Sequence, residues 1–566
     1  MPTFIRLTEY RDSDSKEAGF FDPRNRHTAN QDNFFKIPGN PIAYWVSQQT
    51  INIFEKYDQI YKCSISEGQN ITANNDKYLR LWFEVNNTKI EKAGKWRFYA
   101  KGGEFRKWFG NIEYVIDWSQ EERNNYRAHS SARIIPEYLQ FREGVTWTLI
   151  TSSKQSYRLL PDYATFDKGG SSIFFDNYDD LRKCLLFLNT KISAYLTKIF
   201  NATLNLQVDD VRKLPISPSL IEINEEIYQI LIDISHEEWD SRETSWDFHI
   251  NELIRHKTNN HKIQTTYDAY CAYWREKFLQ LHANEEELNR LFIEIYGLEE
   301  ELTPNVPLED ITILKSESKI IDDELVFNAD EIARQFISYA VGCMFGRYSL
   351  DRDGLVIANM GQAIPTDTSF EIDDDNIIPV LEEEVFSDDI AARFEHFVAV
   401  AFGDEFVGEN IRWIEQSVGM EIRKYFVAEF YKDHVRRYKK RPIYWMVQSP
   451  KKGFSALIYM HRYQSDTMAR VQTMYLREYL TKIDSLIEHT RSVSNNPDSS
   501  AKDAKEAGKS LTKLEAKQRD ALDFDRGDMS RVAALQIAID LDDGVKVNYQ
   551  KFKGVLPDIG LSKGED

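Results

Sequence analysis

The sequence predicts an α+β protein in which a β-rich part precedes a large, mainly α-helical C-terminal region. Between residues 70 and 175, short segments rich in β-branched and aromatic residues alternate with glycine- and serine-containing turns. After residue 181, apolar residues instead recur at helical spacing through long charged segments. Hydrophobic residues make up 42% of the 566 residues, which is enough for several large cores, and no internal repeat is evident.

The N-terminal part is predicted to contain a strand, a polar loop and a short helix. Residues 2–10 have the composition of a strand, with no partner strand before them, and a polar loop extends to Asp32. Pro38, Gly39 and Pro41 predict a rigid turn, after which a helix ends before Cys63.

Strands and helices are then predicted in succession. The expected strands are Tyr78–Val85, Glu113–Trp118, two within Gly144–Pro161, one within Lys168–Phe175, one within Asn201–Ile216 after a loop, and a pair around Pro450–Gly453. The expected helical regions are Leu181–Phe200, Glu222–Leu298 with Gly297 as a C-cap, Asp330–Tyr348, Ile390–Phe430, most of the chain after Thr467, and Ala501–Leu522. Ser494–Ser500 is predicted to be a loop, and the C-terminal tail is expected to pack through Val545, Val547, Tyr549 and Phe552.

The stretch Gly94–Asn111 combines adjacent glycines with interleaved cations and aromatic rings. The glycines are Gly102 and Gly103, the cations are Lys95, Arg97, Lys101, Arg106 and Lys107, and the aromatics are Trp96, Phe98, Tyr99, Phe105, Trp108 and Phe109. One interpretation is a loop that approaches a polyanion, pairs with phosphates and stacks on bases. The other is a β-hairpin whose cations snorkel over a small aromatic core. Both remain open from the composition.

A second basic segment spans residues 423–441, where eight cations face two acids, Glu429 and Asp433. The chain as a whole has a formal net charge of -20 and a pI near 5.2, so it is not expected to coat DNA non-specifically. A local cationic excess in such a chain is typical of a phosphate-contacting surface, and the alternative is an ordinary exposed helix face.

No catalytic or metal-binding residues are predicted. The sequence contains no GxGxxG, GxxxxGK[ST], HExxH or GxSxG pattern. His256 and His261 are expected in a solvated loop, and the acidic runs Asp373–Asp375 and Glu382–Glu384 on a solvated surface. The four cysteines are far apart and no run is apolar enough to span a membrane, so a reducing, cytoplasmic location is expected.

Seven long segments together resemble the PglX family, the adenine-specific DNA methyltransferases of BREX phage-defence systems. They are IPGNPIAYW (37–45), RLWFEV (80–85), KWRFYAKGGEFRKWFGN (95–111), TSWDF (244–248), ELNRLFIEIYGLEEELTP (287–304), ISYAVGCMFGRYSLD (337–351) and YKDHVRRYKKRPIYW (431–445). The resemblance extends in order over essentially the whole chain.

The resemblance also implies that a catalytic part is missing. Complete members of the family are about twice as long, and their first half carries an S-adenosylmethionine-binding Rossmann domain and an NPPY motif that orients the amine of a flipped adenine. Here the only Asn-Pro pairs are Asn40-Pro41 and Asn496-Pro497, and neither lies in an NPPY context. We therefore expect a truncated, split or partial reading frame that binds DNA, holds no cofactor and does not methylate DNA alone.

By this resemblance the chain divides into five parts. They are a remnant edge strand and linker of the missing methyltransferase domain (1–35), a target-recognition domain (36–220), a helical spacer (221–330), a mainly helical domain with a strand pair and basic patch (331–490), and C-terminal helices with a tail (491–566).

The expected partner is double-stranded DNA, with other BREX proteins or a separately encoded methyltransferase half as further partners. Arg106 and Lys107 are expected to donate to guanine or phosphate, Asn111 to pair with adenine, and Gly102 and Gly103 to let the backbone approach a phosphate. The remaining expected contacts are Arg80, Lys95, Arg97, Lys101, Trp108, Arg436, Arg437, Lys439, Lys440 and Arg441. The alternative function is a helical scaffold that docks other defence-system proteins.

Overall fold

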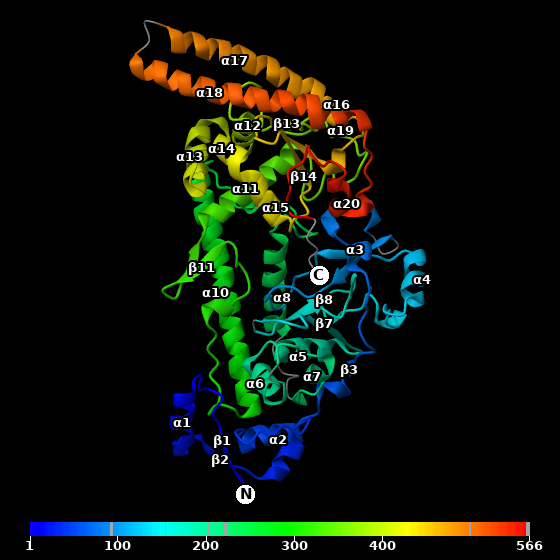
Figure 1. The fold of residues 1–566 in the computed structure, drawn as a ribbon. Helices are drawn as coiled ribbons and strands as arrows, with labels where there is room; N and C mark the ends of the chain where they lie inside the picture. Colours follow the sequence, from blue (N-terminus) through cyan, green and yellow to red (C-terminus); the bar gives the residue numbers. More distant parts are fainter. Residues whose placement is uncertain (91–93, 153, 202, 219–224, 497–499, 562–566) are drawn as a thin grey trace.

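The computed structural model describes residues 1–90, 94–152, 154–201, 203–218, 225–496 and 500–561. Its elements are arranged along one long axis, with the N-terminal segment at one end and a helical hairpin at the other (Figure 1). Several small sheets and many helices confirm the predicted mixed α+β class. No helix of the described residues has the length and apolarity needed to cross a bilayer.

The N-terminal segment contains four short elements, and its last helix joins the main core through Ile51 and Ile53. Its elements are β1 (Thr3–Ile5), α1 (Ser13–Phe21), β2 (Arg26–Thr28) and α2 (Gln48–Lys56). The loop predicted up to Asp32 is therefore wrong, because Asp12 caps α1 by accepting a hydrogen bond from the Ser15 amide at 2.8 Å. The predicted strand is confirmed as β1, which pairs antiparallel with β2, and the predicted helix is confirmed as α2.

The β-rich part consists of two four-stranded sheets, with strand orders β3-β10-β7-β8 and β4-β6-β5-β9. The strands are β3 (Ser64–Ile65), β4 (Leu79–Leu81), β5 (Trp96–Ala100), β6 (Tyr114–Asp117), β7 (Gly144–Trp147), β8 (Tyr157–Leu160), β9 (Ala164–Phe166) and β10 (Ser172–Phe175), with α3 (Asn75–Tyr78) and α4 (Gln120–Ala128) beside them. The predicted strand Tyr78–Val85 is shorter than expected, because a 3₁₀ turn follows β4 at Trp82–Glu84.

Three helices follow β10: α5 (Tyr178–Leu188), α6 (Lys191–Phe200) and α7 (Val208–Arg212). The single helix predicted over Leu181–Phe200 is wrong, because Thr190 starts a new helix by accepting from the Ser193 amide. The strand predicted before Ile216 is also wrong. The Asp210 carboxylate accepts from the Gln207 amide at 3.1 Å and begins α7 there instead.

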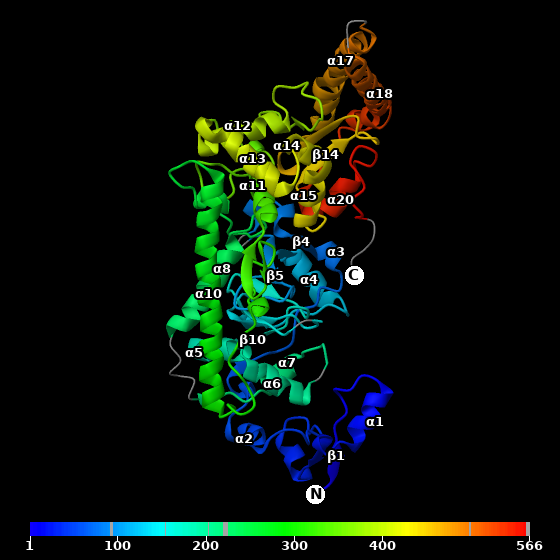
Figure 2. The same cartoon turned by 90° about the vertical axis from the view of Figure 1, so that its left-hand side faces the viewer.

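The central region is built on one long helix. Its elements are α8 (Glu225–Asp240), α9 (Glu252–Arg255), α10 (Ile263–Tyr296), β11 (Ser318–Ile321) and β12 (Glu324–Phe327). The helix α10 has 34 residues and runs alongside the β-rich part (Figure 2). Gly297 ends it at φ 65°, which confirms the predicted C-cap. The start predicted at Glu222 and the boundary predicted at 220 lie outside the described residues.

The C-terminal region surrounds a three-stranded sheet of order β13-β15-β14. Its elements are α11 (Ala329–Met344), β13 (Ile378–Pro379), α12 (Ile390–Phe402), α13 (Val407–Val418), α14 (Ile422–Tyr425), α15 (Tyr431–Arg437), β14 (Tyr444–Gln448), β15 (Ser455–Tyr459), α16 (Thr467–Arg470), α17 (Arg477–Asn495), α18 (Ala501–Phe524), α19 (Ser530–Leu535) and α20 (Gly544–Gln550). The predicted strand pair is confirmed as β14 and β15. The predicted loop Ser494–Ser500 lies partly outside the described residues.

The C-terminal tail returns to the β-rich part. Val545, Tyr549 and Phe552 are buried as predicted, whereas Val547 is exposed on the outer face of α20. The Asp542 carboxylate, 10% exposed, accepts hydrogen bonds from Lys89, Lys95 and Trp96 of the β-rich part at 2.8, 3.1 and 3.1 Å. One continuous cluster of buried apolar side chains extends from Ile37 to Leu561. The five-part domain division stays a prediction.

Replacing Asp542 by alanine should lower the free energy of unfolding by about 2 kcal/mol, because three hydrogen-bond donors lose one charged acceptor. Burial raises the pKa of Asp542, but the bonds from Lys89, Trp96 and Lys95 outweigh it, so the pKa lies below its usual value. This stabilisation is therefore present above the ordinary aspartate pKa and is lost as the pH falls through the lower folded-state value. Urea unfolding at several pH values from neutral to acidic measures this stabilisation. The control is Asp523→Ala, which changes an exposed aspartate. Equal midpoints for the two variants would refute the role of Asp542.

Candidate nucleic-acid interface

The stretch Gly94–Asn111 forms one strand and a long loop. The strand β5 pairs antiparallel with β6, with Trp96 opposite Asp117 and Tyr99 opposite Tyr114. Trp96 and Phe98 are buried in the main core, and Tyr99 is buried in a second, smaller cluster. The loop from Lys101 to Glu113 then folds back against the helices of the central region.

Three of the predicted DNA contacts in this loop are buried. The Arg106 guanidinium donates to Glu238 of α8 at 2.6 Å and to the Ser235 carbonyl at 2.9 Å. Lys107 and Trp108 both donate to Glu285 of α10, at 2.5 and 2.8 Å. We therefore correct the expectation for these three residues: they fasten the loop to α8 and α10 and are not available to a duplex.

The electrostatics of the buried pairs support this assignment. Burial alone would raise the pKa of Glu238, but the guanidinium groups of Arg106 and Arg242 lower it, so the carboxylate stays ionised. Arg158, also buried, donates to the Arg106 carbonyl at 3.0 Å, and burial next to Arg106 lowers its pKa to about 9. The positive charge of this loop is thus directed inward.

The two glycines allow close approach of the chain itself. A Cβ at Gly102 (φ 81°) would lie 2.7 Å from the Gly169 carbonyl, and one at Gly103 (φ 146°) would lie 2.6 Å from the Asn111 amide. Asn111 donates that amide to the Glu104 carbonyl at 3.0 Å. The packing accounts for all three residues, so the phosphate approach and adenine pairing expected of them are not needed to explain the sequence.

Arg80, Lys95 and Arg97 are also engaged within the protein. Arg80 donates to the carbonyls of Asp76, Leu79 and Asp542. Lys95 pairs with Asp117 and Asp542. The Arg97 guanidinium lies 3.4 Å from the ring centroid of Phe141. All three side chains are half-buried, so their charges are less accessible than the sequence suggests.

The second basic segment divides into buried and exposed cations. Arg437 is buried and pairs with Glu331 and Asp433 at 2.9 and 3.3 Å, and Arg441 lies 4.0 Å from Glu84 with only 17% exposure. In contrast, the side chains of Arg436 and Lys439 are 70% and 50% exposed, and Lys440 is exposed. These three cations end or follow α15, and Lys424 and Lys432 of the same segment are exposed as well.

The structure brings the two basic segments together. Lys439 forms an ion pair with Glu113, and the Lys101 ammonium lies 5.7 Å from the ring centroid of the adjacent Tyr114. The rings of Phe83 and Tyr438 pack at 4.7 Å next to this contact. We call Lys101, Arg436, Lys439 and Lys440 the composite basic surface.

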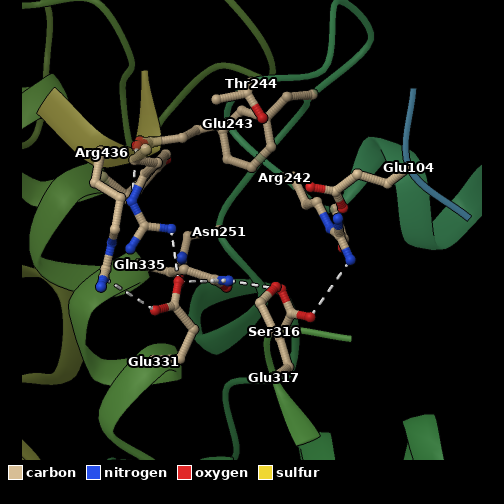
Figure 3. Close-up of a pocket in the computed structure, with 14 residues that line it drawn as sticks. Glu104, Arg242, Glu243, Thr244, Asn251, Ser316, Glu317, Glu331, Gln335 and Arg436 are labelled. Carbon is tan, nitrogen blue, oxygen red and sulfur yellow. Dashed lines mark hydrogen bonds and ion pairs between the residues drawn. The ribbon is translucent and has the colours of Figure 1, made fainter. Parts of the chain in front are cut away.

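A polar cavity of about 420 Å³ lies next to this surface, between Glu104 of the loop and Arg436 (Figure 3). Arginine and glutamate side chains alternate around it, among them Arg242, Glu317 and Glu331. Burial raises the pKa of Glu243 in its wall, against the opposing effect of Arg437. Most of its charges are paired, since Arg242 pairs with Glu238 and Glu317 and Arg437 pairs with Glu331, so these side chains hold the surrounding segments together.

Two groups of described residues have ligand atoms within 4.8 Å of one another, as a metal site would require: His236, Asp240 and Asp247, and Asp373, Asp374 and Asp375. We assign no metal to either group. His236 and Asp240 pair at 3.1 Å, and the Asp373 carboxylate lies 3.9 Å from the Arg393 guanidinium.

The solvated surface expected for the acidic runs is found only in part. Asp374, Glu382 and Glu384 are exposed as expected, whereas Asp373 is buried and the partly buried Glu383 pairs with Lys517 at 2.6 Å. His256 is only 13% exposed and lies 3.2 Å from Glu252, whereas His261 is exposed as expected. In each case, side chains from other elements supply burial or a counter-charge that local composition does not reveal.

Sequence reasoning also missed the acids that bury the loop. Glu238 is 1% exposed and Glu285 is 3% exposed, although both belong to helices with many exposed carboxylates. A signal was present, since each acid lies three or four residues from apolar residues on the buried face of its helix, such as Ile234 and Leu281. The burial of these two carboxylates is explained only by their ion pairs with Arg106 and Lys107 of the loop.

Arg106→Ala should destabilise the protein by about 3 kcal/mol, because it leaves a buried carboxylate with one guanidinium fewer. Arg436→Ala removes the same charge from a side chain that is 70% exposed, so it should change stability by less than about 1 kcal/mol. Denaturant midpoints of the two variants test this, and equal midpoints would contradict the structural role of Arg106.

Comparison with known proteins gives two curated relatives, and no protein-family model matches the sequence. The adenine-specific methyltransferase BrxX of Escherichia coli O9:H4 (strain HS) is 35% identical over 603 aligned residues, which cover 100% of this chain and 48% of that protein. The adenine-specific methyltransferase PglX of Lacticaseibacillus casei (strain Zhang) is 33% identical over 594, covering 97% of this chain and 48% of that protein. The chain thus spans about half the length of these relatives.

These identities confirm the resemblance carried by the seven sequence segments. The chain is, over nearly its whole length, a homologue of about half of the adenine-specific methyltransferases BrxX and PglX.

Proposed function

We propose that this chain is the DNA-recognition part of a BREX-type adenine-specific DNA methyltransferase, which marks host DNA during phage defence. Homology to BrxX and PglX over about half their length supports the enzyme class. Convergence of two basic segments into the composite basic surface supports duplex contact by this part. In the cytoplasm, the chain would act with a methyltransferase half and with other BREX proteins.

The convergence of two distant segments is the observation that carries the proposal. Lys439 and Glu113, paired across the composite basic surface, are 326 residues apart in sequence. The protein has a net charge of -20, so exposed cations gathered at one place attract phosphates locally without making the whole molecule bind polyanions.

Backbone strain at the same place is a second support. Lys439 and Lys440 are consecutive non-glycine residues with φ of 50° and 57°. Each such residue costs about 1 kcal/mol or more relative to a relaxed backbone, and helices normally use glycine there. The amides of Lys439 and Lys440 donate to the carbonyls of Arg436 and Val435 at 3.0 and 2.8 Å, which holds the turn. Keeping lysines in this conformation is consistent with selection for their charge.

The geometry supports phosphate contact more than base reading. Asn111 and the glycines are engaged with their own loop, so we assign no base-reading residue. In this proposal the exposed lysines and Arg436 bind the duplex backbone, which fixes orientation and gives a steep salt dependence.

S-adenosylmethionine is proposed to bind the other half of the enzyme. Among the named strands of the described residues, only β5 and β9 pair in parallel, and a parallel doubly wound sheet is the setting expected for that cofactor in this family. The residues present do not fit the cofactor, so we derive no methyl-transfer step here.

Lys439→Gly with Lys440→Gly should weaken duplex binding about tenfold and make the slope of log affinity against log salt shallower by about two. Glycine relieves the positive φ but loosens the unfolded chain, so stability should stay within about 1 kcal/mol. Fluorescence anisotropy with a labelled duplex, together with thermal unfolding, measures both quantities.

Lys452→Gly is the matched control, because Lys452 is also an exposed lysine with φ of 61°, in the β14–β15 turn. It should leave DNA affinity unchanged. The proposal fails if the wild-type chain shows no salt-dependent binding, or if the control weakens binding as much as the double variant. Methyl transfer by the chain alone would refute the assignment of catalysis to another half.

A second function, that of a protein-interaction scaffold, is favoured by one observation. The antiparallel hairpin of α17 and α18 projects from the helical end of the molecule (Figures 1 and 2). Its outer surface is strongly charged, and Arg491 links the two helices through Glu515 at 2.8 Å. A projecting hairpin of this kind offers two helix faces to a partner protein.

Replacing residues 490–512 by a short glycine–serine turn separates the two functions. This change leaves the composite basic surface intact, so duplex affinity should stay within about twofold of wild type. Co-purification of other BREX proteins with the full chain and with the shortened chain measures docking. Loss of docking with intact DNA binding supports a scaffold role for the hairpin, whereas unchanged docking contradicts it.

A further inference from the structure

A cavity of about 320 Å³ lies on the outer face of the sheet β4-β6-β5-β9, beside α4. This face carries the smaller core cluster, which includes Tyr99, Ile116, Trp118 and Tyr126. The described residues that line the cavity and matter here are Arg97, Arg123, Arg127, Trp118, Gln140 and Phe141. Neither the composite basic surface nor any predicted site includes Arg123 or Arg127.

Three arginines converge on this cavity from two elements. Arg97 comes from β5, and Arg123 and Arg127 lie four residues apart on α4, which places them on one face of that helix. The only carboxylate among the lining residues is Glu137, which is 82% exposed and lies 3.4 Å from Arg127. The lining is therefore cationic in a protein with a strong negative net charge.

Arg123 is the most informative of the three. Its Nη2 donates to the neutral amide oxygen of Gln120 at 2.6 Å, and its Nε is buried without a hydrogen-bond partner. No carboxylate of the described residues lies within ion-pair distance of it. Arg97 lines the same cavity, and burial, followed by the charge of Arg123, lowers its pKa.

A bound anion would compensate the positive charge that these arginines gather around the cavity. Guanidinium groups bind phosphate through pairs of parallel N–H donors, and such bonds strengthen next to apolar walls. The rings of Trp118 and Phe141, packed at 5.6 Å, supply such a wall. We propose that the cavity lined by Arg97, Arg123 and Arg127 binds a phosphate group.

The position of the cavity favours DNA as the source of this phosphate, and to that extent the inference rests on the proposed function. Arg97 and Lys101 lie at the start and just beyond the end of β5, about 13 Å apart along an extended chain. Lys101 covers Tyr114, whose ring packs against the same small core cluster. Phosphates of one DNA strand rise about 3.4 Å per nucleotide along the helix axis and also wind around it, so a single strand reaches both sites within a few nucleotides.

The test uses Arg123→Gln, Arg127→Gln and the double variant in the full chain. Arg127 is exposed, Arg123 is half-buried with no carboxylate of the described residues in ion-pair range, and glutamine has a similar helix propensity, so these variants should fold as wild type. Arg519→Gln on α18 is the matched control, because it removes an exposed arginine from the far end of the molecule.

Two measurements distinguish the sources of phosphate. The first is duplex DNA affinity as a function of salt, and the second is thermal stabilisation by inorganic phosphate or adenosine monophosphate against potassium chloride at equal ionic strength. If the phosphate belongs to DNA, the double variant should bind duplex about tenfold more weakly, with a salt slope shallower by about two. If the site takes a free phosphate, the variant should lose the extra stabilisation and keep its DNA affinity.

The inference is overturned if the double variant matches wild type in both measurements, or if Arg519→Gln has the same effect. Failure of the proposed function gives a different pattern, because the wild-type chain would then show no salt-dependent duplex binding at all. In that case stabilisation by inorganic phosphate alone decides whether the arginine cavity is a phosphate site.

Discussion

The buried pairing of the Gly94–Asn111 loop with α8 and α10 is the interaction on which the rest of the structure depends. Arg106 pairs with Glu238, and Lys107 and Trp108 share Glu285. Buried charges of this kind add little net stability compared with apolar packing, but removing one partner is costly. The loop can therefore dock in one way only, which fixes the β-rich part against the long helix α10.

This constraint divides the cations of the molecule into two sets. Those that fasten segments together, such as Arg106 and Arg437, are buried against carboxylates. Within the two basic segments, the exposed Arg436, Lys439 and Lys440 lie where the end of α15 meets the loop. In an acidic protein, this separation lets a small cationic surface act on phosphates while the rest of the molecule repels them. The distribution of charge thus matters more for function than the number of cations in either segment.

Local patterns predicted the fold well and the site poorly. The β14–β15 pair and the cap at Gly297 follow from residues that are neighbours in sequence. The burial of Arg106 does not, because its partner Glu238 lies 132 residues away. For the same reason, the sequence pattern identified the two basic segments but did not predict that they lie together through the Lys439–Glu113 ion pair. A cation-rich segment predicts that its charges interact with anions. Only tertiary contacts decide whether those anions are buried carboxylates of the protein or phosphates that bind from solvent.

The same reasoning limits where a duplex could lie if both proposed phosphate sites contact it. The composite basic surface includes Lys101 at the end of β5, and the arginine cavity includes Arg97 at its start. A duplex that touches both must follow the outer face of the sheet β4-β6-β5-β9, next to α4. In the proposed function, a catalytic part that flips an adenine from this duplex would approach from the side of the DNA that this sheet leaves open. The positions of the two phosphate sites would therefore constrain how the recognition part and the proposed catalytic part are oriented on the DNA.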